Sequence, residues 1–155
     1  MAYDVTMGSV VRQDTNGTKG TRESRWFQVL RWVDGGYFVW RGFHKWVTPA
    51  AQWMIPRVTL ALPTTPLASI IRRWIFPHAE TFGIILGTVE VLAGGLLLVR
   101  RRFWLAPLVL FLLNGLFFLT LGFKEPHDMA LNLLMGILNL WFFRSAWERK
   151  RSPEK

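Results

Sequence analysis

A long apolar segment, residues 81–99, contains a single ionisable side chain, Glu90, near its midpoint. A helix of this length can cross the ~30 Å hydrocarbon core of a bilayer. A carboxylate at that depth costs about 3 kcal/mol or more unless another group pairs with it. The segment therefore predicts a membrane helix that turns Glu90 toward a polar partner inside a bundle.

Three other hydrophobic segments, residues 26–46, 103–123 and 129–143, are candidates for further membrane spans. The first carries several charges, and the last is short but is flanked by tryptophans that suit the membrane interface. Together with residues 81–99 they predict an all-α fold, an integral membrane four-helix bundle over residues 26–144.

The connection between the first two predicted spans, residues 47–80, contains five prolines, which exclude one continuous helix. Between Pro66 and Pro77, apolar residues recur at helical spacing beside Arg72 and Arg73. This pattern is typical of a short amphipathic helix lying in the membrane interface. We therefore expect an additional interfacial helix in this long outer loop.

The distribution of positive charge predicts the orientation. The chain has 19 Lys plus Arg against 10 Asp plus Glu, and most of the basic residues lie in the tails, residues 1–25 and 145–155, and in the turn at residues 100–102. Basic loops stay on the cytoplasmic side, so both tails are expected to be cytoplasmic in a multi-pass protein. In this apolar context the basic residues indicate contact with membrane lipids rather than with nucleic acid. The absence of cysteine excludes disulfides and thiolate metal sites.

Each predicted span has one face of polar or small residues, as expected if four helices enclose a polar interior. The predicted buried polar centre consists of Glu90, Asp34, Arg41, Lys45, Asn114, Asn132 and Asn139. The glycines predicted to allow close helix packing are Gly42, Gly83, Gly87, Gly94 and Gly136.

Structural roles compete with functional ones at these positions. Asparagines inside membranes commonly join helices by hydrogen bonds, and we favour that role for all three amides. Arg31 and Lys45 are expected to extend toward the two headgroup layers, whereas Asp34 and Arg41 lie deeper and are better candidates for a specific pair. Glu90 is a candidate for either role.

Three histidines, His44, His78 and His127, are expected on the outer side of the membrane, with carboxylates near two of them. Such a group could bind a metal or handle protons. No two of them have the close helical spacing of a recognised metal motif, so we expect no metal.

Two stretches resemble the DoxX-like family of small membrane proteins. Residues 37–46 read YFVWRGFHKW, with a glycine three residues before a lysine near the helix end, and residues 87–98 read GTVEVLAGGLLL, with a glutamate followed by glycines. The resemblance covers residues 26–144 and includes the basic turn and the apolar third span. The residues that match the family's motifs one by one are Gly42, Lys45, Gly87, Glu90 and Gly94. It implies a four-helix protein of the bacterial cytoplasmic membrane, linked in some members to quinone-dependent oxidation.

The preferred hypothesis is an accessory, non-catalytic subunit of a membrane redox complex that is linked to quinone electron transfer and contacts other integral membrane subunits. A quinone is the only cofactor that this hypothesis suggests. The alternatives are a quinone-dependent oxidoreductase subunit, in which Glu90 takes a proton, and a small-molecule transporter that uses the polar interior.

Overall fold

The computed structural model describes residues 25–99, 103–122 and 124–151. All secondary structure in these residues is helical and none is strand, which confirms the all-α fold class. The N-terminal tail before Arg25, the basic turn at residues 100–102 and the last four residues of the C-terminal tail lie outside the described residues.

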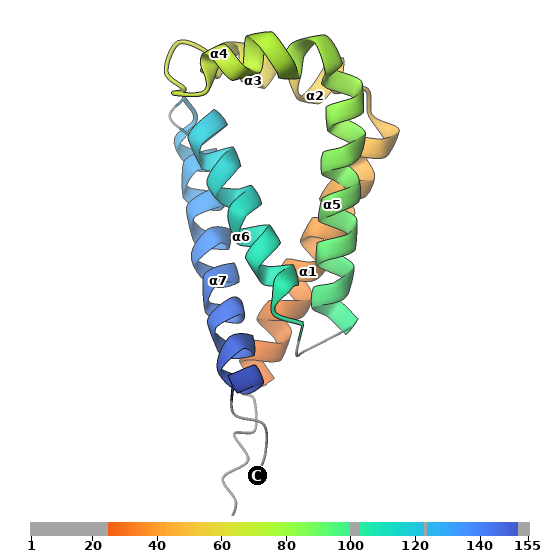
Figure 1. The fold of residues 1–155 in the computed structure, drawn as a ribbon, viewed down its shortest axis with the longest axis vertical. Coiled ribbons are helices and arrows are strands. Elements are labelled where there is room, and N and C mark those ends of the chain that lie inside the picture. The colour runs from red at the N-terminus through yellow and green to blue at the C-terminus, as the bar shows by residue number, and fades with distance from the viewer. Residues whose placement is uncertain (1–24, 100–102, 123, 152–155) are drawn as a thin grey trace, which may run out of the picture.

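Four long helices form the body of the protein (Figure 1). They are α1 (Arg25–Val47), α5 (Ala79–Val99), α6 (Leu105–Phe117) with its π-helical continuation η3 (Phe118–Gly122), and α7 (Pro126–Arg151). The main contacts pair α1 with α5 and α6 with α7. The two pairs approach each other at the end where α1 begins and diverge toward the opposite end.

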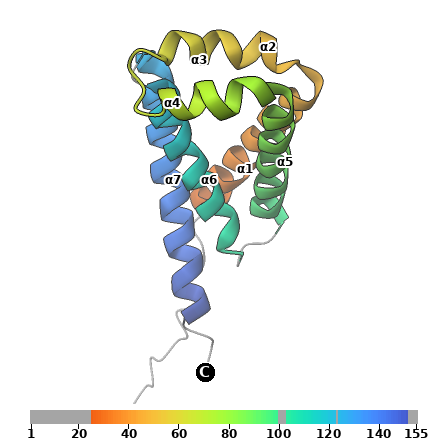
Figure 2. The ribbon, with the colours of Figure 1, turned by 45° about the horizontal axis from the view of Figure 1, so that its top comes forward.

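Short helices cover the end at which the pairs diverge (Figure 2). They are α2 (Ala50–Trp53), α3 (Ile55–Ala61), α4 (Ala68–Ile70), the π-helical η1 (Ile71–Ile75) and the 3₁₀-helical η2 (Phe76–His78). We call this segment the cap. The amphipathic helix expected after Pro66 corresponds to α4 and η1, in which Ile71 is fully buried while Ile70 and Trp74 are exposed. The chain turns at η2, which contains Pro77, and continues down as α5.

Glycines bring α1 and α5 into backbone contact. A Cβ atom on Gly42 would lie 2.5 Å from the carbonyl oxygen of Gly87, and one on Gly94 would lie 2.7 Å from that of Gly35. Any side chain at these positions would separate the helices, because such distances are far below contact range. As the partner residues run in opposite directions along the two helices, α1 and α5 are antiparallel.

Two apolar clusters stabilise the fold. One lies in the bundle, where Phe38 and Leu110 are fully buried beside Phe27, Leu97 and Phe142. The other joins the cap to the top of α5 and consists of Ala50, Met54, Val58, Ile71 and Ala79. The cap is therefore packed against the bundle rather than loosely attached to it.

Two helical stretches among the described residues are long and apolar enough to cross a membrane, Ala68–Val99 and Pro126–Arg151, and Leu105–Leu121 is a shorter apolar helix. The first of these stretches includes the turn at η2, so its straight part is α5. The helix α1 has the length but carries four charged residues along its middle and end, Arg31, Asp34, Arg41 and Lys45.

Candidate ligand-binding site

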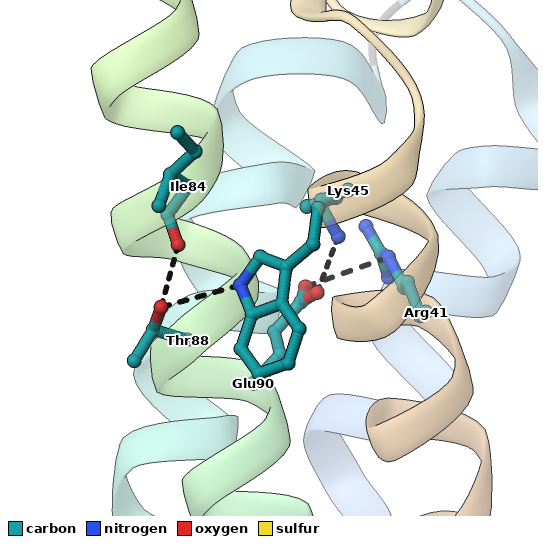
Figure 3. A network of polar contacts seen from close by, with 6 residues as sticks. Arg41, Lys45, Ile84, Thr88 and Glu90 are labelled. Atoms are coloured by element: carbon teal, nitrogen blue, oxygen red, sulfur yellow. Dashed lines mark hydrogen bonds and ion pairs between the residues drawn. The ribbon is translucent and has the colours of Figure 1, made fainter.

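Glu90 of α5 forms the centre of a buried ionic group with two cations of α1 (Figure 3). Its Oε2 accepts a hydrogen bond from Nζ of Lys45, and its Oε1 lies 3.5 Å from Nε of Arg41, an ion-pair distance. The side chains of Glu90 and Lys45 are 0% and 3% exposed, and that of Arg41 is 21% exposed. Glu90, Lys45 and Arg41 are called the ionic triad below.

The helix contact that positions the triad is fixed on both sides. Gly42 and Gly87 let the backbones of α1 and α5 approach one residue from Arg41 and three from Glu90. On the exposed side of this helix contact, Nε1 of Trp46 donates a hydrogen bond to Oγ1 of Thr88 over 3.3 Å, and that hydroxyl donates to the carbonyl oxygen of Ile84. Close helix packing thus places the carboxylate within reach of Arg41 and Lys45.

Aromatic rings complete the surroundings of the cations. The guanidinium carbon of Arg41 lies 4.3 Å from the ring centre of Phe117, and Nζ of Lys45 lies 5.7 Å from the same ring. Nζ of Lys45 is also 5.3 Å from the ring of Trp53 in the cap. A cation over an aromatic face is stabilised by about 2 kcal/mol when it is desolvated. These rings therefore offset part of the cost of burying two positive charges beside one carboxylate.

A cavity of about 830 Å³ opens beside the triad, between the bundle and the cap. Arg41 and Lys45 line it, whereas Glu90 does not. Most of the remaining lining is apolar or aromatic. It includes Tyr37, Trp40, Trp53, Leu86, Ile71 and Phe117. This volume lies within the range of about 300–1,000 Å³ that ligand pockets occupy.

A second polar group lies deeper in the bundle. Asn139 of α7 donates through Nδ2 to Oδ1 of Asp34 in α1 over 3.3 Å, and both side chains are fully buried. Asn114 of α6 is 1% exposed and donates to the carbonyl of Leu110 in its own helix. A Cβ atom on Gly136 would lie 3.7 Å from Cβ of Asn114, an ordinary contact. The polar residues expected as one centre are thus divided, with Glu90, Arg41 and Lys45 in one group and Asp34 with Asn139 in another.

Several pairings differ from those expected from the sequence. Lys45 does not extend toward a headgroup layer but is buried against Glu90, and Arg31 is buried at 4% exposure. Asp34 and Arg41 contact Asn139 and Glu90, not each other. The reason is that Asp34 and Arg41 are about two turns apart on α1, whereas α7 and α5 are rotated so that Asn139 and Glu90 lie closer to them.

The remaining predicted residues lie outside these two polar groups. Asn132 is 5% exposed and lines the cavity. Gly83 faces the cap, since a Cβ there would lie 3.3 Å from the Trp53 ring. The histidines do not meet: in the described part of the chain, the one group of three potential metal ligands within 4.8 Å of one another is Glu125, His127 and Asp128. His44 instead contacts the hydroxyl of Thr48.

Sequence reasoning missed three contributors to the site, Gly35, Trp53 and Phe117. Gly35 could have been found, because it precedes Gly42 by seven residues just as Gly87 precedes Gly94. No comparable signal marks the two aromatic residues, which belong to elements distant in sequence from the triad. No protein-family model, curated protein or solved structure matches this chain.

Proposed function

We propose that this chain is an integral membrane protein of a bacterial cytoplasmic membrane, with α1, α5, α6 plus η3, and α7 as its four spans. The distribution of residues supports this. The fully buried side chains include Glu90, Asp34, Asn139 and Asn114, whereas the outer surface exposes many large apolar residues. Examples of the latter are Trp32, Val33, Ile85, Leu92, Leu112, Leu134 and Ile137. A polar interior with an apolar exterior suits a protein whose solvent is lipid.

The proposed orientation has both termini in the cytoplasm and the cap at the outer interface. It rests on the positive-inside rule applied to the basic tails and to the turn at residues 100–102. The chain has no cysteine, so single introduced cysteines can report the side. In intact cells an impermeant maleimide should label Thr64→Cys in the cap, and it should label Ser152→Cys only after the membrane is opened. The reverse pattern would contradict this orientation.

The function that this geometry supports best is that of an accessory subunit of a membrane redox assembly, which holds a quinone-like molecule beside the ionic triad. The single observation that carries the proposal is the cavity of about 830 Å³ that combines aromatic walls with two cations, the buried Lys45 and the half-buried Arg41. Aromatic rings stack on flat ring systems. Arginine and lysine donate hydrogen bonds of the kind that quinone carbonyls accept.

An accessory role is favoured over a catalytic one because of how Glu90 is held. Its Oε2 accepts the Lys45 hydrogen bond, its Oε1 faces Arg41, and the residue does not line the cavity. A general base must lie within hydrogen-bond reach of the proton that it takes from a substrate. The carboxylate is therefore better suited to holding the two cations in place than to accepting protons during turnover.

Gentle extraction from native membranes tests the proposal. The protein should purify together with redox subunits, and an organic extract of the purified material should contain quinone in a stoichiometric amount. A variant with Trp53→Ala should lose bound quinone while keeping its partners, because Trp53 belongs to the cap side of the cavity. An isolated homo-oligomer that contains neither partner nor quinone would overturn the assignment.

A further inference from the structure

We propose that the cavity selects amphiphiles whose headgroup carries one negative charge, such as a long-chain carboxylate or the deprotonated form of a hydroxyquinone. The proposal rests on the function proposed above and names the ligand class of the same site. It follows from the charges that surround the cavity and from the way in which they face it.

The ionic triad leaves one positive charge uncompensated. Arg41 and Lys45 contribute two cations, and Glu90 contributes one carboxylate. An excess charge beside apolar walls is costly, since the field of an ion is poorly screened there. Interactions with the Phe117 ring offset this cost in part. An anion bound in the cavity would neutralise the remaining charge.

The arrangement of the triad directs that charge into the cavity. Both cations line the cavity wall, while the carboxylate lies behind them and does not. The ring of Trp53, 5.3 Å from Nζ of Lys45, also lines the cavity on this side. Two side chains that only donate thus meet at one part of the wall, Arg41 and Lys45. Such a set recognises an oxyanion better than it recognises a neutral or cationic headgroup.

Other charged groups around the cavity do not cancel the excess. Arg57 and Asp128 also line it, and they carry opposite charges. Asp128 belongs to the first turn of α7, where its Oδ1 lies 3.4 Å from Nε2 of His127. Because these two charges balance, the excess positive charge at the cavity is that of Arg41 and Lys45 over Glu90. The apolar walls extend from there along the cap and α6, where an alkyl chain or ring would be placed.

Matched pairs of ligands test the inference with the detergent-purified full chain. The quinone pair is a 2-hydroxy-3-alkyl-1,4-naphthoquinone, which is anionic at neutral pH, and its neutral 2-methoxy ether, both followed by quenching of tryptophan fluorescence. The lipid pair is dodecanoate and methyl dodecanoate, measured as competitors of the quinone. Each anion should bind at least ten times more tightly than its neutral partner, because one charge-assisted hydrogen bond contributes about 1.5–3 kcal/mol. If only the hydroxyquinone shows this preference, the ligand is a quinone; if both anions do, any acidic amphiphile serves.

Variants separate charge from packing. Arg41→Gln removes the excess charge and should reduce anion affinity at least tenfold while changing the affinity of the methoxy ether less than threefold, and Arg41→Lys should restore the preference. The control Arg144→Gln makes the same change at a cation that is 79% exposed and remote from the cavity, and should bind like the unmodified protein. Size-exclusion profiles and circular dichroism establish that each variant is folded.

The outcomes distinguish this inference from the proposed function. Equal binding of the anionic and neutral members of both pairs would overturn the charge preference and leave a quinone-holding subunit intact. Saturable binding of neither pair would overturn both. A preference that survives in Arg41→Gln would also refute the inference, because the excess charge would then not be its source.

Discussion

The substitution Gly42→Ala should weaken the contact between α1 and α5 on which the ionic triad depends. The added Cβ would lie 2.5 Å from the carbonyl oxygen of Gly87 and 2.9 Å from a methyl carbon of Val91. An ordinary contact between carbon and a carbonyl oxygen is about 3.3 Å. The two backbones would therefore have to separate by several tenths of an ångström at the point where Lys45 reaches Glu90.

The expected magnitude follows from two opposing effects. Inserting a methyl group into a closely packed contact costs about 1–3 kcal/mol. Replacing glycine by alanine within a helix contributes about 1 kcal/mol of stability. Gly36 supplies the matched control, since it lies in the same helix and a Cβ there has nothing within 4 Å. Gly36→Ala experiences only the second effect, so the two variants should differ by about 1–3 kcal/mol.

The measurement is the free energy of unfolding in mixed micelles, obtained by titration with a denaturing detergent and followed by circular dichroism. Gly36→Ala should be as stable as the unmodified protein or slightly more stable. Gly42→Ala should be less stable than Gly36→Ala by about 1–3 kcal/mol. Gly87→Ala should resemble Gly42→Ala, because its Cβ would lie 2.7 Å from the carbonyl oxygen of Gly42. If the Gly36 and Gly42 variants unfold alike, the helices do not meet at Gly42 and the triad is not positioned as described.

Three further predictions follow from polar contacts, two of them buried and one at the start of the cap. Glu90→Gln should reduce the free energy of unfolding by about 3–5 kcal/mol, because it leaves Lys45 buried beside an uncharged amide. The double variant Lys45→Met with Glu90→Leu should recover part of this loss in the same titration. Full stability of Glu90→Gln alone would show that the pair is not buried. Asn139→Leu should cost about 1–3 kcal/mol, since Oδ1 of Asp34 loses its donor, and an additional Asp34→Leu substitution should reduce the loss. The Glu80 carboxylate accepts two hydrogen bonds from backbone N–H groups at the start of α2, over 2.9 and 3.4 Å. Glu80→Ala should therefore accelerate amide hydrogen exchange in the cap with little change in α7. Equal acceleration in both regions would contradict a local role.

Much of the fold follows from local sequence alone. The apolar run over residues 81–99 is a helix because its length and composition allow little else. The observed helix α5 ends at the same residue and starts slightly earlier, at Ala79. The prolines divide residues 47–80 into the short helices of the cap, since proline removes a donor from the helix ladder. Phe27, Arg31, Asp34 and Phe38 recur in steps of three and four, which places them on one face of α1, and this is a face that the structure buries.

Tertiary structure alone decided the pairings and the cavity. Periodicity tells which side chains share a face but not how far each helix is rotated or shifted against its neighbour. That is why Asp34 contacts Asn139, 105 positions away, while Arg41 and Lys45 converge on Glu90. The cavity likewise requires the divergence of two helix pairs beneath the cap, which depends on contacts between elements distant in sequence. Local sequence determines which residues share a helix face, and only helix packing determines which partners they meet.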